Sequence, residues 1–422
     1  MYKQIFRKLM ERCGIALLPW QQFAQMSATQ QRLNEEVEQL RRSERSLVDE
    51  VAALKANSRS LADEVTSLRI VGSLRDAIYG GTTLSESTEQ SERTNLEGRL
   101  ISRLQTSGIK IAADEPVFLH VGFGHAGTTS LQLNFFARRP DLFYLGTPYG
   151  ESGGLFSNLK YLDDFLLVEQ QMLEWCRDVA YTGPRREGRP IVISDETFCD
   201  TSEIYYAPRH LPGDIVALRL KRYFPTAKII FTMRNQLDYI SSMYFNLKRN
   251  YAFLAGASIP EFNEWWEGMH TQARCLYLQN IDYSQMVDVY SRLFGQENIL
   301  ILPLEELKSH GARRYLERLC QFMKLDLRES DVTDFSIPRN ERMTVVESRL
   351  AELVTAGSTE WNAVVRSLLE KESMAGLVAS APRLSIKFDD DQLREVRRVC
   401  VPGNQRLAAE FNLPLAEMGY LM

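Results

Sequence analysis

The sequence predicts an α/β fold, in which a parallel β-sheet is flanked by helices and preceded by an N-terminal coiled-coil helix. Two observations lead to this prediction. From about residue 116 onward, short β-rich apolar runs alternate with helical patterns, which is typical of a parallel sheet covered on both faces. Before that region, leucine recurs at every seventh position from Leu33 to Leu68 over a charged background.

The composition narrows the classes of function. A net charge of -5 gives no support for nucleic-acid binding, so we expect no nucleic-acid partner. The six cysteines are scattered without a C-x-x-C pair, which favours reduced structural thiols, and we expect no metal site. No run of about 18 apolar residues occurs, so we expect no membrane-spanning segment.

Residues 1–30 are predicted to be a basic amphipathic segment. Basic side chains interleave with apolar ones over residues 1–20. The segment has neither a continuous apolar core nor a small-residue cleavage site, so we expect that it is not a secretory signal. Two interpretations remain open. The segment is either a helix packed on the protein itself, which we favour, or a helix that makes weak contact with a membrane surface.

Residues 31–78 are predicted to form a coiled-coil helix. Three repeats of 14 residues cover residues 33–74 and place leucine at each d position of the heptad. Polar residues at alternate a positions, such as Glu44 and Ser58, weaken a coiled coil while they fix its register. We therefore expect a homo-oligomer through residues 33–74, with the number of strands left open.

Residues 79–100 are predicted to be a polar linker, because they contain a Gly-Gly pair and many Ser and Thr residues. The α/β domain then covers residues 101–422. Its predicted strands are 117–121, 191–194, 228–233 and 299–302. Its predicted helices are 127–138, 211–224, 236–249 and 282–294, followed by helical regions at about 343–372 and 391–412.

The stretch HVGFGHAGTTS, residues 120–130, predicts a phosphate-binding loop. A strand, a glycine-rich turn and a helix start aim backbone N–H groups at an anion, so the predicted sheet is of the P-loop type. Its hydroxyl residues Thr128, Thr129 and Ser130 can add donors. Thr128 stands where a Walker A loop has lysine, which disfavours a nucleotide kinase. A plain strand-to-helix turn with a hydroxyl cap is the alternative.

A second pattern is Arg234 at the end of the predicted strand 228–233, with Ser242 two helical turns later. Ligands of open α/β sheets bind at the carboxyl ends of the strands, and the planar guanidinium of arginine suits phosphate. Alone this pair is a weak signal, because an arginine at a strand end is more often part of a surface ion pair.

Together the two patterns resemble the sulfotransferases that use 3′-phosphoadenosine-5′-phosphosulfate (PAPS), in particular the bacterial and carbohydrate-type members. The resemblance covers about residues 116–414 and includes VISDETF (192–198), FGQENILILPLEELK (294–308), IPRNERMT (337–344) and VPGNQRLAAEF (401–411). It implies a sulfotransferase-like fold with PAPS as the cofactor. The residues that it implies hold the 5′-phosphosulfate are Gly124, His125, Ala126, Gly127, Thr128, Thr129 and Ser130, and those for the 3′-phosphate are Arg234 and Ser242.

The resemblance also implies catalytic roles. His125 stands where the family has a lysine beside the oxygen that bridges phosphorus and sulfur. Glu196, after the predicted strand 191–194, is our candidate for the base that accepts the acceptor's proton, although a carboxylate there could instead cap the next helix, as Ser194 or Asp195 could. Arg339 lies in a segment that resembles a cofactor cover. His120 is expected to be a structural histidine inside its strand.

The expected function is transfer of the sulfuryl group to an acceptor hydroxyl, with a saccharide or glycoconjugate as the acceptor class. Two alternatives remain open, namely a non-catalytic nucleotide-binding scaffold and a P-loop phosphotransferase that uses ATP. We expect a cytoplasmic protein, or one that is peripheral at the inner face of the membrane.

Overall fold

The computed structural model describes residues 86–111, 116–146, 159–160, 169–181, 188–199, 213–255, 257–269, 271–335, 342–356, 378 and 380–422. The predicted basic segment 1–30, the predicted coiled coil 31–78 and Arg339 lie outside these residues. Oligomerisation through residues 33–74, membrane-surface contact and cellular location therefore stay predictions.

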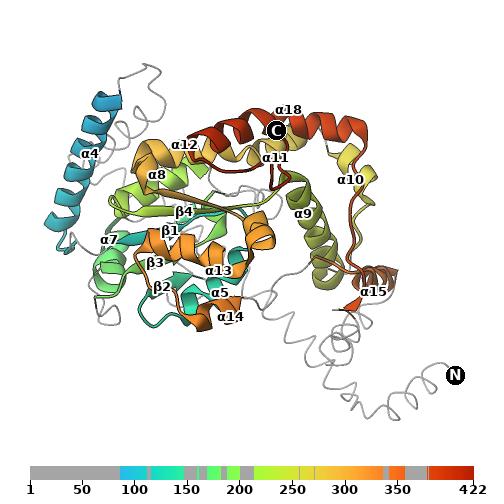
Figure 1. Ribbon diagram of the computed structural model, residues 1–422, viewed down its shortest axis with the longest axis horizontal. Coiled ribbons are helices and arrows are strands. Elements are labelled where there is room, and N and C mark those ends of the chain that lie inside the picture. Colours follow the sequence, from blue (N-terminus) through green and yellow to red (C-terminus); the bar gives the residue numbers. More distant parts are fainter. Residues whose placement is uncertain are drawn as a thin grey trace, which may run out of the picture. The chain divides into compact units, whose positions relative to one another are not determined.

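Five parallel strands form one sheet in the order β2-β3-β1-β4-β5, which confirms the predicted fold class (Figure 1). The strands are β1 (Val117–His120), β2 (Phe143–Gly146), β3 (Ile191–Ser194), β4 (Lys228–Met233) and β5 (Ile299–Pro303). Four of them match predicted strands, and β2 is additional. The central strand β1 pairs with β3 on one side and β4 on the other, so the strand order switches direction there. Open α/β sheets bind ligands at such a switch point.

Helices cover both faces of the sheet. One face carries α8 (Gly213–Tyr223) and α12 (Tyr283–Phe294), and the other carries α5 (Thr128–Asn134), α13 (Leu304–Met323) and α14 (Glu329–Phe335) (Figure 1). Alternate strand residues point to opposite faces. Phe118 packs in the core below α5 and α13, whereas Phe231 meets Tyr290 of α12 edge-to-face at 5.3 Å between ring centroids. Burial on both faces explains why the strands read as continuous apolar runs.

A second core surrounds α9 (Gln236–Asn250), which follows β4. The surrounding helices are α10 (Phe262–Gly268), α11 (Thr271–Asn280), α15 (Val345–Ala356) and α18 (Asp390–Glu410). Asp389 begins α18 with a capping box, in which its carboxylate and the Gln392 side chain satisfy each other's backbone N–H groups. The predicted helical regions 343–372 and 391–412 are thus confirmed over α15 and α18, and residues 357–372 lie outside the described chain.

The predicted linker 79–100 is wrong from residue 86 onward, because this part belongs to helix α4 (Glu86–Thr106). Leu96, Leu100 and Leu104 recur at a spacing of four and are buried. Their contact with the domain outweighs the weak helix propensity of the neighbouring Ser and Thr residues. The polar composition belongs to the exposed side of an amphipathic helix, not to a loop.

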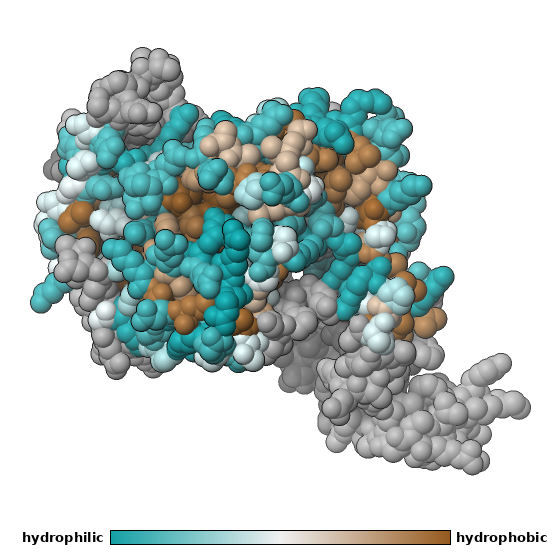
Figure 2. Space-filling view, in the orientation of Figure 1, coloured by the Kyte–Doolittle hydropathy of each residue, from teal (hydrophilic) through white to brown (hydrophobic). Residues whose placement is uncertain are grey.

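The predicted helix 127–138 is also divided. Helix α5 ends at Asn134, and a 3₁₀ turn covers Phe136–Arg138. The face shown in Figure 2 is largely hydrophilic, with areas of hydrophobic residues exposed between the hydrophilic ones. In the described part of the chain, no helix combines the length and the apolar character that a membrane span needs.

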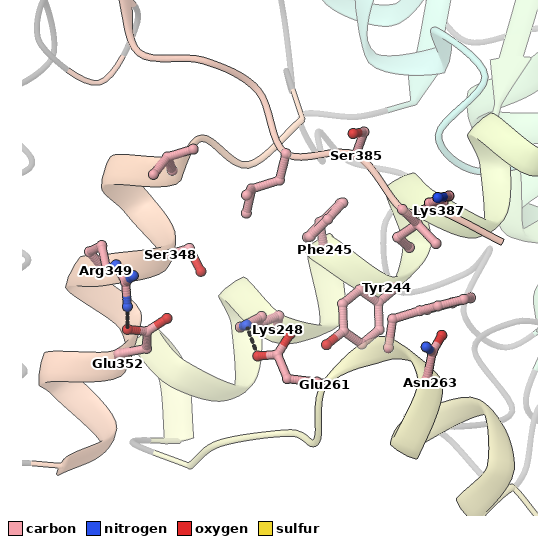
Figure 3. A pocket seen from close by; sticks show the side chains of 14 residues that line it. Tyr244, Phe245, Lys248, Glu261, Asn263, Ser348, Arg349, Glu352, Ser385 and Lys387 are labelled. Carbon is pink, nitrogen blue, oxygen red and sulfur yellow. Dashed lines mark hydrogen bonds and ion pairs between the residues drawn. The ribbon is translucent and has the colours of Figure 1, made fainter. Parts of the chain in front are cut away.

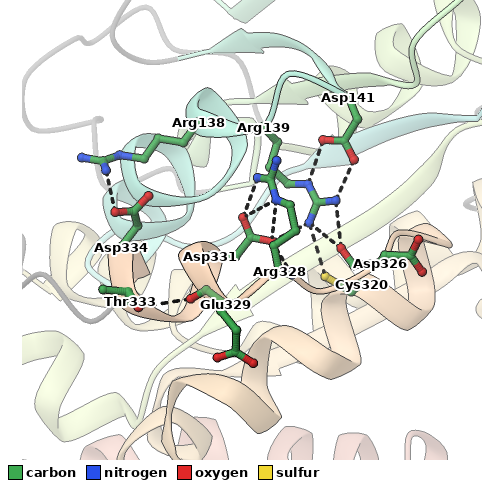
Figure 4. A network of polar contacts seen from close by, with 10 residues as sticks. All are labelled: Arg138, Arg139, Asp141, Cys320, Asp326, Arg328, Glu329, Asp331, Thr333 and Asp334. Carbon is green, nitrogen blue, oxygen red and sulfur yellow. Dashed lines mark hydrogen bonds and ion pairs between the residues drawn. The ribbon is translucent and has the colours of Figure 1, made fainter.

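Arg139 connects the end of this 3₁₀ turn to the segment between α13 and α14 (Figure 4). Its guanidinium donates to Asp331 at 2.8 Å, to Asp141 at 2.6 and 3.0 Å, and to the Asp326 carbonyl at 3.0 Å. The Arg139 side chain is only 1% exposed. A planar guanidinium can serve several oxygens at once, which the single ammonium of lysine cannot reproduce.

We expect Arg139→Lys to lower the free energy of unfolding by about 2 kcal/mol, because buried charged hydrogen bonds are lost. The matched control is Arg138→Lys, whose guanidinium is 42% exposed and pairs with Asp334 at 2.7 Å. Arg138→Lys should lower the free energy of unfolding by less than about 1 kcal/mol. Chemical denaturation measures both values, and equal losses would contradict the structural role of Arg139.

Candidate active site

The glycine loop follows β1 and is held in place by the neighbouring strand β4. The N–H groups of Val121 and Phe123 donate to carbonyls of β4, at 3.0 and 2.9 Å. A Cβ atom at Gly122 would lie 1.8 Å from the Thr232 hydroxyl oxygen and 2.6 Å from its backbone nitrogen, so no other residue fits there. Gly127 has a φ of 82°, which glycine adopts readily, and helix α5 begins directly after it.

His125 lies in this loop with a φ of 60°, in the left-handed region. Its carbonyl oxygen accepts a hydrogen bond of 3.0 Å from Arg234, the residue that follows β4. Its ring lies 6.2 Å from the Tyr239 ring in an edge-to-face arrangement. The structure therefore brings the predicted 5′-phosphate loop and the predicted 3′-phosphate arginine into direct contact, through the loop backbone.

Glu196 faces the same loop. The carboxylate of Asp195 caps the 3₁₀ turn Glu196–Phe198 by accepting from the Thr197 N–H at 3.0 Å. The Glu196 carboxylate instead accepts a hydrogen bond from the Thr128 hydroxyl at the start of α5. Asp195 is therefore the residue that caps the turn. Glu196 does not cap it and instead contacts Thr128, the first residue of the helix that follows the glycine loop.

The remaining predicted loop residues share this setting. Gly124 and Ala126 are buried in the loop, and Thr129 and Ser130 are partly exposed in the first turn of α5. Ser242 lies two turns into α9 and is 7% exposed.

Arg234 sits in a cluster of cations that the sequence did not reveal. Burial lowers the pKa of Arg234, and nearby Asp238 opposes this effect. Asp238 also accepts from Arg342 at 2.7 Å and from Lys308 at 3.4 Å. Glu305 is a second carboxylate near Arg234, so three cations face two carboxylates at the start of α9. The remaining positive charge favours an anionic ligand. The Arg234 Nε atom is buried without a hydrogen-bond partner among the described residues.

His120 is a structural histidine, as expected. Its Nδ1 atom lies 2.7 Å from the Ser194 hydroxyl, and its Nε2 atom lies 3.3 Å from the Thr232 hydroxyl. The side chain is fully buried, and this burial lowers its pKa to about 3, although Asp195 acts in the opposite direction. The neutral imidazole thus links β1 to both neighbouring strands directly below the loop.

This low pKa predicts acid sensitivity. An unfolded histidine binds a proton near pH 6.5, whereas folded His120 stays neutral down to about pH 3. The unfolded chain therefore takes up more protons in this interval, and the free energy of unfolding falls as the pH drops below about 6.5, by up to about 1.4 kcal/mol per pH unit. In His120→Asn, the free energy of unfolding should fall less steeply between pH 6 and pH 4 than in the wild type, when both are measured by denaturation at constant ionic strength. An unchanged slope would show that His120 does not cause the loss.

A cavity of about 440 Å³ lies elsewhere, between α9, α10, α15 and residues 384–387 (Figure 3). Its lining includes the ion pairs Lys248–Glu261 at 2.7 Å and Arg349–Glu352 at 2.6 Å, but none of the predicted site residues. The predicted phosphate loop, Glu196 and Arg234 gather instead at the carboxyl ends of the strands. Among the described residues, no group of three or more His, Cys, Asp and Glu side chains is arranged to hold a metal ion.

The chain is similar to known sulfotransferases. The chain is 28% identical to human sulfotransferase 2A1 over 211 residues, which are 49% of this chain and 67% of that protein. Among solved structures, the sulfotransferase from Alicyclobacillus acidocaldarius aligns with 73% of this chain and 99% of its own, at 17% identity and a TM-score of 0.38. Mouse sulfotransferase SULT7A1 complexed with PAP aligns with 73% of this chain and 92% of its own, at 17% identity and a TM-score of 0.33.

The family model described as the sulfotransferase domain matches residues 118–343, more than half of the chain. This range begins in β1 and includes the phosphate loop, the turn that carries Glu196 and the Arg234 cluster. The chain therefore belongs to the sulfotransferase domain family.

Proposed function

We propose that the protein transfers the sulfuryl group of PAPS to an acceptor hydroxyl on a saccharide or glycoconjugate. The observation that carries this proposal is the meeting of three strand ends. The Thr128 hydroxyl of the loop after β1 donates to Glu196 after β3, and Arg234 after β4 donates to the His125 carbonyl. The saccharide class rests on the resemblance of the matching stretches to carbohydrate-type members.

The described residues fit the two phosphate ends of such a donor. Loop N–H groups and the hydroxyls of Thr129 and Ser130 suit the 5′-phosphate at the start of α5, while the Thr128 hydroxyl donates a hydrogen bond to Glu196. The unsatisfied Nε atom of Arg234 and the Ser242 hydroxyl suit the 3′-phosphate, and the surrounding cations offset its charge. PAPS supplies the sulfuryl group together with a phosphate leaving group.

The protein's own groups then have two tasks in transfer. Glu196 holds a carboxylate next to the loop, where it can take the proton of the acceptor hydroxyl. His125 and the loop donors can oppose negative charge on the oxygen that leaves with the phosphate. By analogy with phosphoryl transfer, positioning and charge stabilisation account for most of the rate.

Arg234→Ala tests the binding assignment. We expect the affinity for 3′-phosphoadenosine-5′-phosphate to weaken by roughly 2–4 kcal/mol, the scale for losing one partner of a buried charged hydrogen bond. Adenosine-5′-phosphosulfate lacks the 3′-phosphate, so the affinity for this ligand should weaken much less. Calorimetry measures both affinities, with Arg349→Ala on α15 as the control. Equal losses for both ligands would show that Arg234 does not recognise the 3′-phosphate.

Activity is tested with PAPS labelled in its sulfur and a panel of neutral and uronic-acid-containing oligosaccharides. Label transferred to a saccharide supports the proposal. Nucleotide binding without transfer to any saccharide or to water would support a non-catalytic scaffold instead. Magnesium-dependent ATP turnover would support a phosphotransferase.

A further inference from the structure

Lys160 lies almost completely buried beside the turn that carries Glu196. It is 4% exposed, and its ammonium donates to the Asp195 carboxylate at 2.9 Å and to the Thr197 hydroxyl at 2.6 Å. The Thr197 hydroxyl in turn donates to the other Asp195 oxygen at 2.6 Å. These three side chains form a closed ring of hydrogen bonds, and two of them, Asp195 and Thr197, flank Glu196 in sequence.

The ring is anchored on both sides. Arg219 of α8 donates to the carbonyl of Leu159 at 2.8 Å, which fixes the backbone next to Lys160. The Asp195 N–H donates to the His120 carbonyl at 3.1 Å, which ties the turn to β1. An Asp195 carboxylate this buried needs a cationic partner, because an unpaired buried charge is strongly destabilising.

The ring also determines which carboxylate reaches the loop. Both Asp195 oxygens are engaged, one by Lys160 and the other by Thr197, so Asp195 is held away from the loop. Glu196 is the neighbour left to meet the Thr128 hydroxyl. The two adjacent carboxylates thus have different tasks, and Lys160 separates them.

We propose that Lys160 is a positioning residue, which holds the turn 195–198 so that the Glu196 carboxylate faces the phosphate loop. The inference rests on the proposed function in so far as Glu196 is the base. Lys160 itself does not act on the donor or the acceptor. Its contribution to the rate is geometric, since a misplacement of about 1 Å can cost about 100-fold in rate.

The chain offers a matched control in Lys221. This second buried lysine is 0% exposed and donates to one carboxylate, Glu97 at 2.6 Å, and to one further oxygen, the Pro225 carbonyl at 2.6 Å. Glu97 belongs to α4, so the ion pair joins α4 to α8 and involves none of the site residues. Lys221→Met should destabilise the fold as Lys160→Met does, without affecting the turn 195–198.

The experiment compares Lys160→Met with Lys221→Met in the full-length protein, by hydrogen exchange and by steady-state kinetics. We expect amide exchange in the peptide that contains Thr197 and Phe198 to become about 10- to 100-fold faster in Lys160→Met only, because the ring that stabilises the turn is lost. We expect kcat to fall about 10- to 100-fold with KM for PAPS unchanged. If Lys160→Met does not fold, Lys160→Gln, which keeps a neutral donor, replaces it.

The outcomes separate the two proposals. Unchanged exchange in the turn, or equal kcat values for the two lysine variants, would overturn the positioning role. A wild type that transfers no sulfuryl group to saccharide or to water would refute the proposed function. Faster exchange in Lys160→Met would still show, in that case, that Lys160 stabilises the turn.

Discussion

Glu196→Gln is expected to lower kcat for sulfuryl transfer by about 10²–10⁴-fold, the range for losing a positioned general base. Glutamine has nearly the same size, and its amide oxygen can still accept the hydrogen bond that the Thr128 hydroxyl donates to Glu196. It cannot accept a proton from the acceptor. The change therefore removes the proposed chemistry while it preserves the contact between the turn and the loop.

Two further measurements make this prediction specific. Affinity for 3′-phosphoadenosine-5′-phosphate should stay within about threefold of wild type, because the phosphate contacts assigned to the loop and to Arg234 are intact. Glu297→Gln serves as the control, since this carboxylate is 60% exposed and pairs with Arg93 of α4. A Glu196→Gln enzyme that turns over at the native rate would show that Glu196 only anchors Thr128.

The fold could be predicted where both faces of a strand are buried. β1, β3, β4 and most of β5 read as continuous apolar runs because helices cover both sides of the sheet. β2 escaped prediction because two of its four residues are only partly buried, whereas β5, the other edge strand, is buried at four of its five residues. The sequence indicated a linker over α4 because the polar side of this helix dominates the composition. Only the packing of α4 against α8 and α12 shows that three leucines point inward.

The sequence predicted only those site residues that are recognisable from their position next to a strand or a glycine turn. The loop 122–130, Glu196 and Arg234 each follow a strand, and parallel strands bring such residues to one edge of the sheet. Lys160 and Arg342 could not be found this way. They meet Asp195 and Asp238 at sequence separations of 35 and 104, and no spacing rule connects them.

His125→Ala is expected to lower kcat by about 10²–10³-fold, the cost of losing one transition-state donor, with little effect on nucleotide affinity. The structure explains why binding and catalysis should separate here. Arg234 holds the loop through the His125 carbonyl oxygen, a backbone atom that every substitution retains. The imidazole is therefore not needed to keep the loop and Arg234 together, and its removal should affect mainly the charge that develops on the leaving oxygen.

His125→Lys should keep most of the activity, because it restores the residue type that the family has at this position. Backbone geometry allows the exchange, since Lys324 of this same chain adopts a φ of 57°, close to the 60° of His125. A lysine ammonium stays charged to higher pH than an imidazolium, so the Lys variant should hold its rate above neutral pH better than the wild type. Rates measured from pH 6 to pH 9 test this comparison. If His125→Ala turns over as fast as the wild type, the side chain has no part in the transfer, and the loop acts through its backbone and hydroxyl donors alone.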